Sequence, residues 1–96
     1  MRYFTTKYFT TKEQTRTLNK SYELVPSGEN FSIGELISVL PFQVTYKNVK
    51  YNLNIMPWNG QWLIRYSDLG GSSICRASEV ELVDALYKII ENLNTL

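Results

Sequence analysis

Apolar and polar residues alternate through residues 42–66, and this period of two predicts an antiparallel sheet in the middle of the chain. Asn59-Gly60 interrupts the alternation with a dipeptide that favours a two-residue type I′ turn, because both turn positions need a positive φ. With a turn of two residues, Ile55 lies opposite Ile64 in the hairpin. A second turn at Lys47-Asn48 adds the strand before it, so the stretch predicts a three-stranded meander.

This register gives the meander one apolar face and one polar face, and a slip of one residue would mix them. The apolar face is expected to point inward and holds Phe42, Val44, Tyr46, Val49, Tyr51, Leu53, Ile55, Trp62, Ile64 and Tyr66. The polar face holds Gln43, Thr45, Lys50, Asn52, Asn54 and Arg65. One face of an antiparallel sheet commonly contacts water, so the polar face is either solvated or a recognition surface.

The chain after the meander predicts a fourth strand and a long helix. Residues 68–72 form a turn cluster, and residues 73–77 are expected to continue the sheet. Ser78 and Glu81 have the spacing of a capping box, which predicts a helix over residues 79–93. An apolar stripe on this helix is expected to pack on the sheet. It comprises Val80, Leu82, Val83, Leu86, Ile89, Ile90 and Leu93.

The N-terminal part of the chain is basic and aromatic, and it predicts two further strands. A tandem repeat of YFTTK over residues 3–12 is rich in residues that favour strands, so residues 2–10 are expected to form the first. Apolar residues at even spacing favour a second strand over residues 16–25.

A break in the pattern at Pro26 marks a surface loop over residues 26–31. Ser32 and Glu35 then repeat the capping-box spacing, which predicts a short helix near residues 32–40. Pro41 ends this helix, because the residue before a proline avoids the α conformation.

Together these elements predict a single α+β domain of 96 residues. Its antiparallel meander sheet has four to five strands, with the C-terminal helix packed on one face and a short helix near residues 32–40. Within the domain, residues 1–25 are basic, aromatic N-terminal strands and residues 26–31 are a loop. Residues 32–96 supply the short helix, the meander and the C-terminal helix.

Composition favours the cytoplasm. No apolar run approaches the roughly 18–20 residues that span a bilayer. The N-terminus is too polar for a secretory signal peptide. Cys75 is the one cysteine, so it cannot form an internal disulfide, which favours a reducing compartment. We therefore expect a cytoplasmic protein that makes no membrane contact.

The residues that carry most enzyme chemistry are missing or better explained by structure. The sequence contains no histidine, which is the commonest general base and a frequent metal ligand. Cys75 without histidine lacks the usual partner that activates a thiolate, and it is expected to be a small core residue. Glu79, Glu81 and Asp84 suit the start of a helix. We therefore expect no enzymatic activity, no catalytic residue, no cofactor and no metal.

Residues 50–93 carry a resemblance to a known family. They give the order strand, Asn-Gly turn, strand ending in SDLGG, short strand, and a helix opening SEVELVDALYKII. This order resembles the N-terminal sheet-and-helix module of HicB-type antitoxins, and many small phage proteins are similar. The prolines of the family's turn are absent here, and we expect no DNA-binding segment of the kind that often follows the module. The resemblance implies a small binding module.

Two hypotheses for function follow. In the first, the chain is a protein-binding module of the antitoxin, inhibitor or phage anti-defence type, which acts by occluding a partner protein. The N-terminal strand is expected at a sheet edge, where it could pair with the partner or with a second copy to give a homodimer. Trp58 at the hairpin tip is expected to be exposed, and Trp58→Ala is then expected to weaken partner binding.

In the second hypothesis, the N-terminal segment binds nucleic acid, with cations at phosphates and aromatic rings stacked on bases. Five of the ten basic residues and one of the nine acidic residues lie in residues 1–20. The same pattern also suits a soluble strand with a protected edge. The candidate partner-binding residues are Arg2, Tyr3, Phe4, Lys7, Tyr8, Phe9, Lys12, Arg16 and Trp58.

Overall fold

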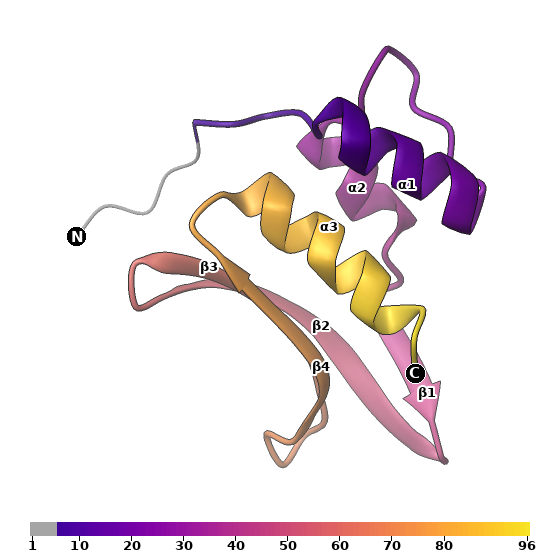
Figure 1. Ribbon diagram of the computed structural model, residues 1–96. Helices are drawn as coiled ribbons and strands as arrows, with labels where there is room; N and C mark the ends of the chain where they lie inside the picture. Colours follow the sequence, from indigo (N-terminus) through magenta and orange to yellow (C-terminus); the bar gives the residue numbers. More distant parts are fainter. Residues whose placement is uncertain (1–5) are drawn as a thin grey trace.

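The computed structural model describes residues 6–96, which form a curled antiparallel sheet with helices on one side (Figure 1). The elements of this part of the chain follow the order α1 (Lys12–Tyr22), α2 (Ile33–Val39), β1 (Gln43–Tyr46), β2 (Val49–Trp58), β3 (Gln61–Ser67), β4 (Ser73–Glu79) and α3 (Leu82–Leu93). The predicted α+β fold, with a C-terminal helix on one face of a meander, is confirmed.

The sheet has the strand order β1-β2-β3-β4, and its register is the predicted one. Ile55 is the partner of Ile64. Both hairpins turn through two residues with positive φ: Lys47 and Asn48 have φ of 49° and 67°. Asn59 and Gly60 have φ of 51° and 77°, which is the type I′ geometry expected of this dipeptide. The turn chemistry therefore determines the pairing.

Pro57 protects one edge of the sheet. Trp58 and Gln61 are paired across a two-residue turn, so the nitrogen of Pro57 points away from β3. The nitrogen of Pro57 faces the other side of β2, where β1 would lie if it were longer. Since β1 pairs with β2 only as far as Asn52, no strand lies beside Pro57 there. At the other edge, the Asn92 side chain of α3 donates to the Arg76 carbonyl of β4 at 2.9 Å. Both features reduce the number of free groups that another strand could pair with.

The two predicted N-terminal strands are wrong within the described residues. Residues 12–22 form α1, and Phe9 makes only an isolated bridge to Ser32. Thr11 caps α1 in a reciprocal capping box with Gln14, a spacing that competes with the strand pattern of the repeat. Thr15 and Leu18 are buried on the inner side of α1. The remainder of the first predicted strand, residues 2–5, lies outside the described residues.

Helix α2 begins as predicted, with Ser32 and Glu35 in a capping box. Glu35 also accepts the backbone N–H of Ser27 at 2.8 Å, so it fixes the loop before the helix. Hydrogen bonds from the backbone N–H groups of Ser27 and Ser32 lower the pKa of this carboxyl. Glu35 therefore stabilises the loop and the helix start together.

Helix α3 begins later than predicted, because β4 extends to Glu79. The Ser78 hydroxyl donates to the Gln61 side chain at 2.6 Å instead of capping a helix. Val80 is 64% exposed and does not belong to the apolar stripe. Glu81 occupies the N-cap position but makes no side-chain cap bond.

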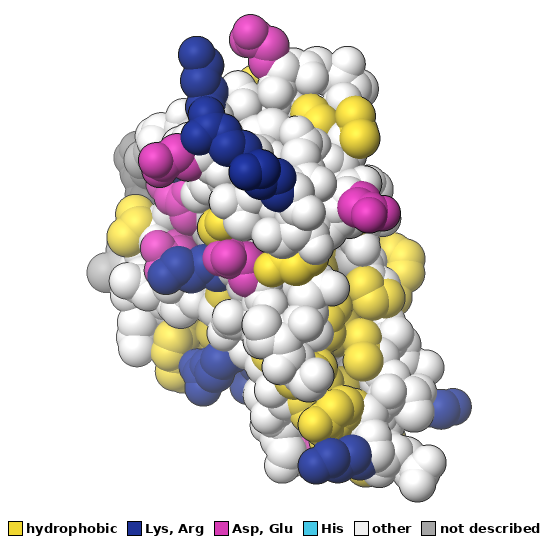
Figure 2. All heavy atoms as spheres, turned by 45° about the vertical axis from the view of Figure 1, so that its right-hand side comes forward, with side chains coloured by type: hydrophobic (Ala, Val, Ile, Leu, Met, Phe, Trp, Pro, Cys, Tyr) yellow, Lys and Arg dark blue, Asp and Glu magenta, His cyan; other side chains and the backbone are white. Residues whose placement is uncertain are grey.

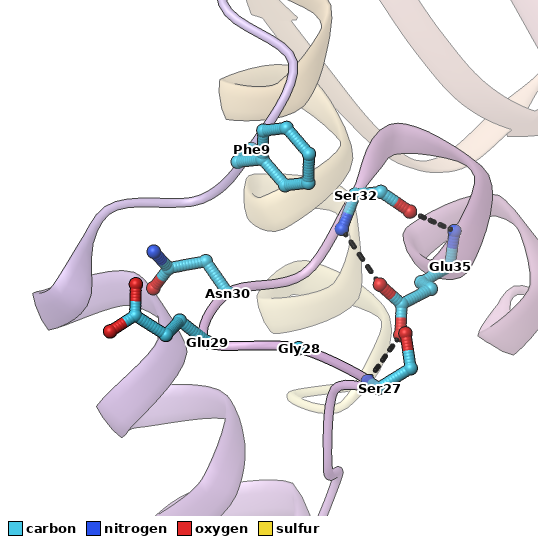
Figure 3. Close-up of a pocket in the computed structure, with 7 residues that line it drawn as sticks. All are labelled: Phe9, Ser27, Gly28, Glu29, Asn30, Ser32 and Glu35. Carbon is cyan, nitrogen blue, oxygen red and sulfur yellow. Dashed lines mark hydrogen bonds between the residues drawn. The ribbon is translucent and has the colours of Figure 1, made fainter.

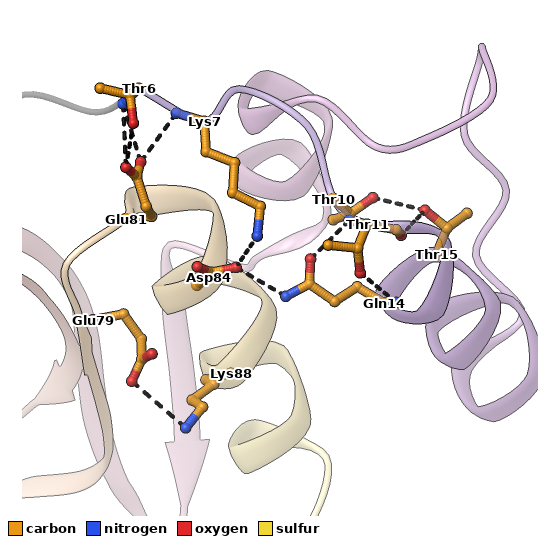
Figure 4. A network of polar contacts seen from close by, with 10 residues as sticks. All are labelled: Thr6, Lys7, Thr10, Thr11, Gln14, Thr15, Glu79, Glu81, Asp84 and Lys88. Carbon is orange, nitrogen blue, oxygen red and sulfur yellow. Dashed lines mark hydrogen bonds and ion pairs between the residues drawn. The ribbon is translucent and has the colours of Figure 1, made fainter.

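The acidic side chains at the start of α3 hold the N-terminal segment instead (Figure 4). Glu81 accepts the backbone N–H groups of Thr6 and Lys7, each at 3.0 Å. Asp84 accepts the Lys7 ammonium at 2.8 Å and the Gln14 amide at 2.9 Å. These contacts join residues that are at least 70 positions apart in the sequence, so the N-terminal segment is anchored on α3.

The main core surrounds α3, which lies between the sheet on one side and α1 and α2 on the other (Figure 1). Its buried hydrophobic members are Leu18, Phe31, Leu36, Leu40, Ile64, Tyr66, Ala77, Val83, Ala85, Leu86, Ile89 and Ile90. Tyr66 is fully buried, and its hydroxyl donates to the Pro41 carbonyl at 2.7 Å. This bond ties the segment after α2 to the centre of the sheet.

Tyr66 makes stability sensitive to alkaline pH. Burial, with a smaller contribution from nearby Cys75, raises the pKa of Tyr66 to about 12. Because the folded pKa lies above the unfolded value of about 10, the stabilisation is complete below pH 10 and is lost as pH rises towards 12. We expect the free energy of unfolding to fall by on the order of 2 kcal/mol across this window. Urea unfolding at several pH values measures it, and an equal fall in Tyr66→Phe would contradict the assignment.

Candidate binding surfaces

The helix-side face of β1 and β2 is apolar but only partly covered. Val44, Tyr46 and Tyr51 are half-buried, Val49 is 40% exposed, and Phe42, just before β1, is 82% exposed. We call these five residues the apolar strip. The prediction that the whole apolar face points into the core is wrong for Phe42 and Val49, and Ile55 on the same face is 36% exposed.

The strip is only partly covered, because α3 is short and begins at the far side of the sheet. Two residues, Val80 and Glu81, connect β4 to α3, so the helix must begin beside the end of β4. Its twelve residues span about 18 Å. Its most extensive contacts are with β4, β3 and α2, so α3 lies mainly over the β3–β4 half of the sheet.

A hollow of about 180 Å³ lies on the helix side of the molecule, where α1, α2 and α3 end. Its lining includes Leu24, Val39 and Leu93. Figure 2 shows hydrophobic side chains running down this face from the helices to the sheet. The apolar surface is therefore larger than the strip alone.

The opposite face of the sheet carries no helix (Figure 1) and is basic. By the register, Lys50, Arg65 and Arg76 lie on this face. None of the strand residues on it is acidic within the described part of the chain. Leu63, also on this face, is only 3% exposed, so side chains of the same face cover it. Trp58 stands at the end of this face and is 54% exposed.

Helix α1 presents a third surface, a row of cations. Lys12, Arg16 and Lys20 are spaced by four residues, which places them about 6 Å apart along one side of the helix. All three are exposed, and none forms an ion pair with a described residue. Figure 2 shows lysine and arginine side chains gathered in a band over the upper part of the molecule, where α1 lies.

The structure separates the predicted partner-binding residues. Lys7 is held by Asp84 in an ion pair and is therefore engaged within the fold. Lys12 and Arg16 lie in the α1 row, while Trp58 lies at the far end of the sheet. Tyr8 and Phe9 are exposed in the segment before α1. The remaining three candidates, Arg2, Tyr3 and Phe4, lie outside the described residues.

Phe9 lines a hollow of about 470 Å³ beside the loop before α2 (Figure 3). Ser27, Glu29, Asn30 and Glu35 contribute to its wall. The Glu35 carboxylate already accepts two backbone N–H groups of the loop and the helix start. This acid therefore has a structural role, and the exposed Phe9 ring is the feature of the hollow that a partner could contact.

The described residues offer little to covalent chemistry or metal binding. Burial raises the pKa of the Cys75 thiol, which disfavours the reactive thiolate. Within residues 6–96, no group of three or more histidine, cysteine, aspartate or glutamate side chains is placed to hold a metal ion. None of the helices in this range is long and apolar enough to cross a membrane.

Comparison of the chain with protein-family models, curated proteins and solved structures finds no match. Three surfaces therefore remain as candidates for binding: the apolar strip, the basic face of the sheet and the row of cations on α1. Sequence reasoning missed the strip, because alternation shows which residues share a face and not which of them a helix covers. It also missed the α1 row, although Thr11 and Gln14 carry the capping-box signal of that helix.

Proposed function

We propose that the chain is a non-enzymatic protein-binding module that occludes the surface of a partner protein through the apolar strip. The observation that carries the proposal is the exposure of Phe42 at one end of the strip and of Val49 at the other, with Val44, Tyr46 and Tyr51 only half-buried. Exposed apolar surface of this kind is unfavourable in water and marks interaction sites in soluble proteins. Aromatic residues at the centre of an interface commonly supply much of the binding energy.

The surroundings of the strip also favour a protein partner. Lys47 and Asn48 border it at the turn of the β1–β2 hairpin, and polar residues at the rim of an apolar centre are typical of protein interfaces. The resemblance of residues 50–93 to HicB-type antitoxins supports an antitoxin-, inhibitor- or anti-defence-like role, and it stays a prediction.

A homodimer through an N-terminal edge strand has no basis in the described residues, because no such strand is present there. The edges of the described sheet belong to β1 and β4. β1 has only four residues, and short edge strands pair poorly. A homodimer could instead form through the apolar strip. The molar mass in solution would then be that of two chains.

Co-purification from the source cell tests the proposal. Tagged protein is captured, and bound proteins are identified and quantified by mass spectrometry. We expect a partner in stoichiometric amount, which is lost when Phe42 is replaced. A monomer by light scattering that recovers no stoichiometric protein would sink the proposal.

Nucleic-acid binding is a second candidate, and the row of Lys12, Arg16 and Lys20 on α1 favours it. Repeated cations along a helix suit a regular line of phosphates. Three such contacts would make the logarithm of the binding constant fall with the logarithm of salt concentration, with a slope of about −2.7 on duplex DNA.

We expect the variant Lys12→Glu/Arg16→Glu/Lys20→Glu to lose any binding to duplex or single-stranded probes at low salt, because it reverses all three charges. Electrophoretic mobility shifts measure this. The control variant Lys88→Glu removes a cation that already pairs with Glu79 at 3.5 Å on α3. Absence of binding by the unmodified protein at low salt would eliminate this candidate.

A further inference from the structure

We propose that Arg65 and Arg76 form an oxyanion-binding site on the face of the sheet that carries no helix. Arg65 on β3 and Arg76 on β4 are direct cross-strand partners. Their Cβ atoms are therefore about 5 Å apart on the same face. Like charges in this arrangement destabilise a sheet, so the pair is unfavourable unless something neutralises it.

No described residue neutralises the pair. Neither arginine takes part in an ion pair within residues 6–96, and the strands of this face carry no carboxylate there. The Nε atom of Arg65 is buried without a hydrogen-bond partner. A buried donor without an acceptor is costly, so the fold does not satisfy this guanidinium, and a ligand would contact its outer Nη donors.

The chemistry of the guanidinium group defines the ligand. Its planar set of donors matches the two oxygens of a carboxylate or a phosphate, and two neighbouring guanidinium groups can share one anion. Asn54 lies opposite Arg65 on the other side and donates to the Ser67 hydroxyl at 2.8 Å. Arg76, Arg65 and Asn54 therefore form a polar row across three strands.

The site is independent of the proposed protein docking, because the apolar strip lies on the other face of the sheet. The anion we assign to it is a carboxylate of an acidic protein segment, because one pair of arginines matches a single carboxylate, whereas a nucleic acid needs a line of cations along its phosphates. A phosphate of a nucleic acid is the alternative outcome. Both offer the same oxygen pair, and the experiment below separates them.

The test uses the full chain and measures the Arg65 Nε–H resonance by NMR. The probes are hexaglutamate, a ten-nucleotide single strand and inorganic phosphate, each compared with sodium chloride at equal ionic strength. We expect at least one probe to shift the resonance. We expect Arg76→Glu to weaken that binding at least tenfold, because it places an acid opposite Arg65.

The same substitution should raise thermal stability, which a merely structural arginine would not do. Removing the repulsion and adding an opposite charge is expected to raise Tm by about 1–5 °C. Arg76→Gln is the second variant, with a smaller rise and a similar loss of binding. Lys88→Glu on α3 makes the same change of charge on another surface, and its effect on binding should stay within about twofold.

Each outcome is decisive. A response to hexaglutamate assigns the site to protein carboxylates, and a response to the oligonucleotide assigns it to phosphodiesters. A response to inorganic phosphate alone supports the site and assigns it to a free anion. No shift with any probe would overturn the proposal, as would an equal loss of binding in Lys88→Glu. If no probe shifts the resonance but a protein partner still binds the apolar strip, the oxyanion site is refuted and the proposed function is unaffected.

Discussion

Replacement of Phe42 with alanine is expected to weaken binding of the co-purified partner by at least about 30-fold. A central aromatic contact typically contributes 2 kcal/mol or more, and each ~1.4 kcal/mol is a factor of ten in affinity. Phe42 is 82% exposed, so its loss removes little packing from the chain itself. We therefore expect the free energy of unfolding to change by less than about 0.5 kcal/mol. Titration calorimetry and urea unfolding measure the two quantities.

Trp58→Ala is the matched control for Phe42→Ala. It also removes an exposed aromatic ring, but at the hairpin tip on the other face of the sheet. If the partner covers the strip, Trp58→Ala leaves its affinity nearly unchanged. A loss of affinity in Trp58→Ala with none in Phe42→Ala would place the partner at the tip, as the sequence suggests, and would refute docking on the strip.

Leu86→Ala is expected to reduce the free energy of unfolding by about 2–5 kcal/mol. Leu86 is fully buried in the core cluster on α3, and the shorter side chain leaves a cavity that the rigid sheet cannot fill. Urea unfolding followed by circular dichroism measures the loss.

Val80→Ala provides the comparison for Leu86→Ala. Val80 lies just before α3 and is 64% exposed, so its truncation is expected to cost less than about 0.5 kcal/mol. A loss below about 1 kcal/mol in Leu86→Ala would show that α3 does not pack on the sheet as described.

The sheet was predictable because short-range chemistry determines its register. Asn59-Gly60 fixes one hairpin, and the alternation of residues 42–66 agrees with it at every pair. Helix α2 was predictable for the same reason, since Ser32 and Glu35 cap it locally. Where the local signal and the tertiary structure agree, reasoning from sequence succeeds.

The N-terminal region could not be predicted as well, because two local signals conflict there. The repeated aromatic and threonine residues favour a strand, whereas Thr11 and Gln14 favour a helix start. Burial of Leu18 against the core decides in favour of the helix. In the same way, Glu81 has the spacing of a cap, but its contacts with Thr6 and Lys7 exist only in the folded chain.

The candidate surfaces depend on what each face contacts, and a linear pattern does not contain that information. Alternation placed Phe42 and Ile64 on the same side of the sheet, yet Ile64 is fully buried and Phe42 is exposed. The pairing of Arg65 with Arg76 also needs the register of β4, which includes an irregularity after Tyr66. Such features become visible only when the strands are assembled.

The anchoring of Thr6 on Glu81 affects how the protein matures during synthesis. The two residues are 75 positions apart, so Thr6 leaves the ribosome long before its acceptor has been translated. Until then Thr6 and Lys7 lack the Glu81 and Asp84 carboxylates that hold them in the folded chain. These contacts therefore form only after the C-terminal part of the chain has been synthesised.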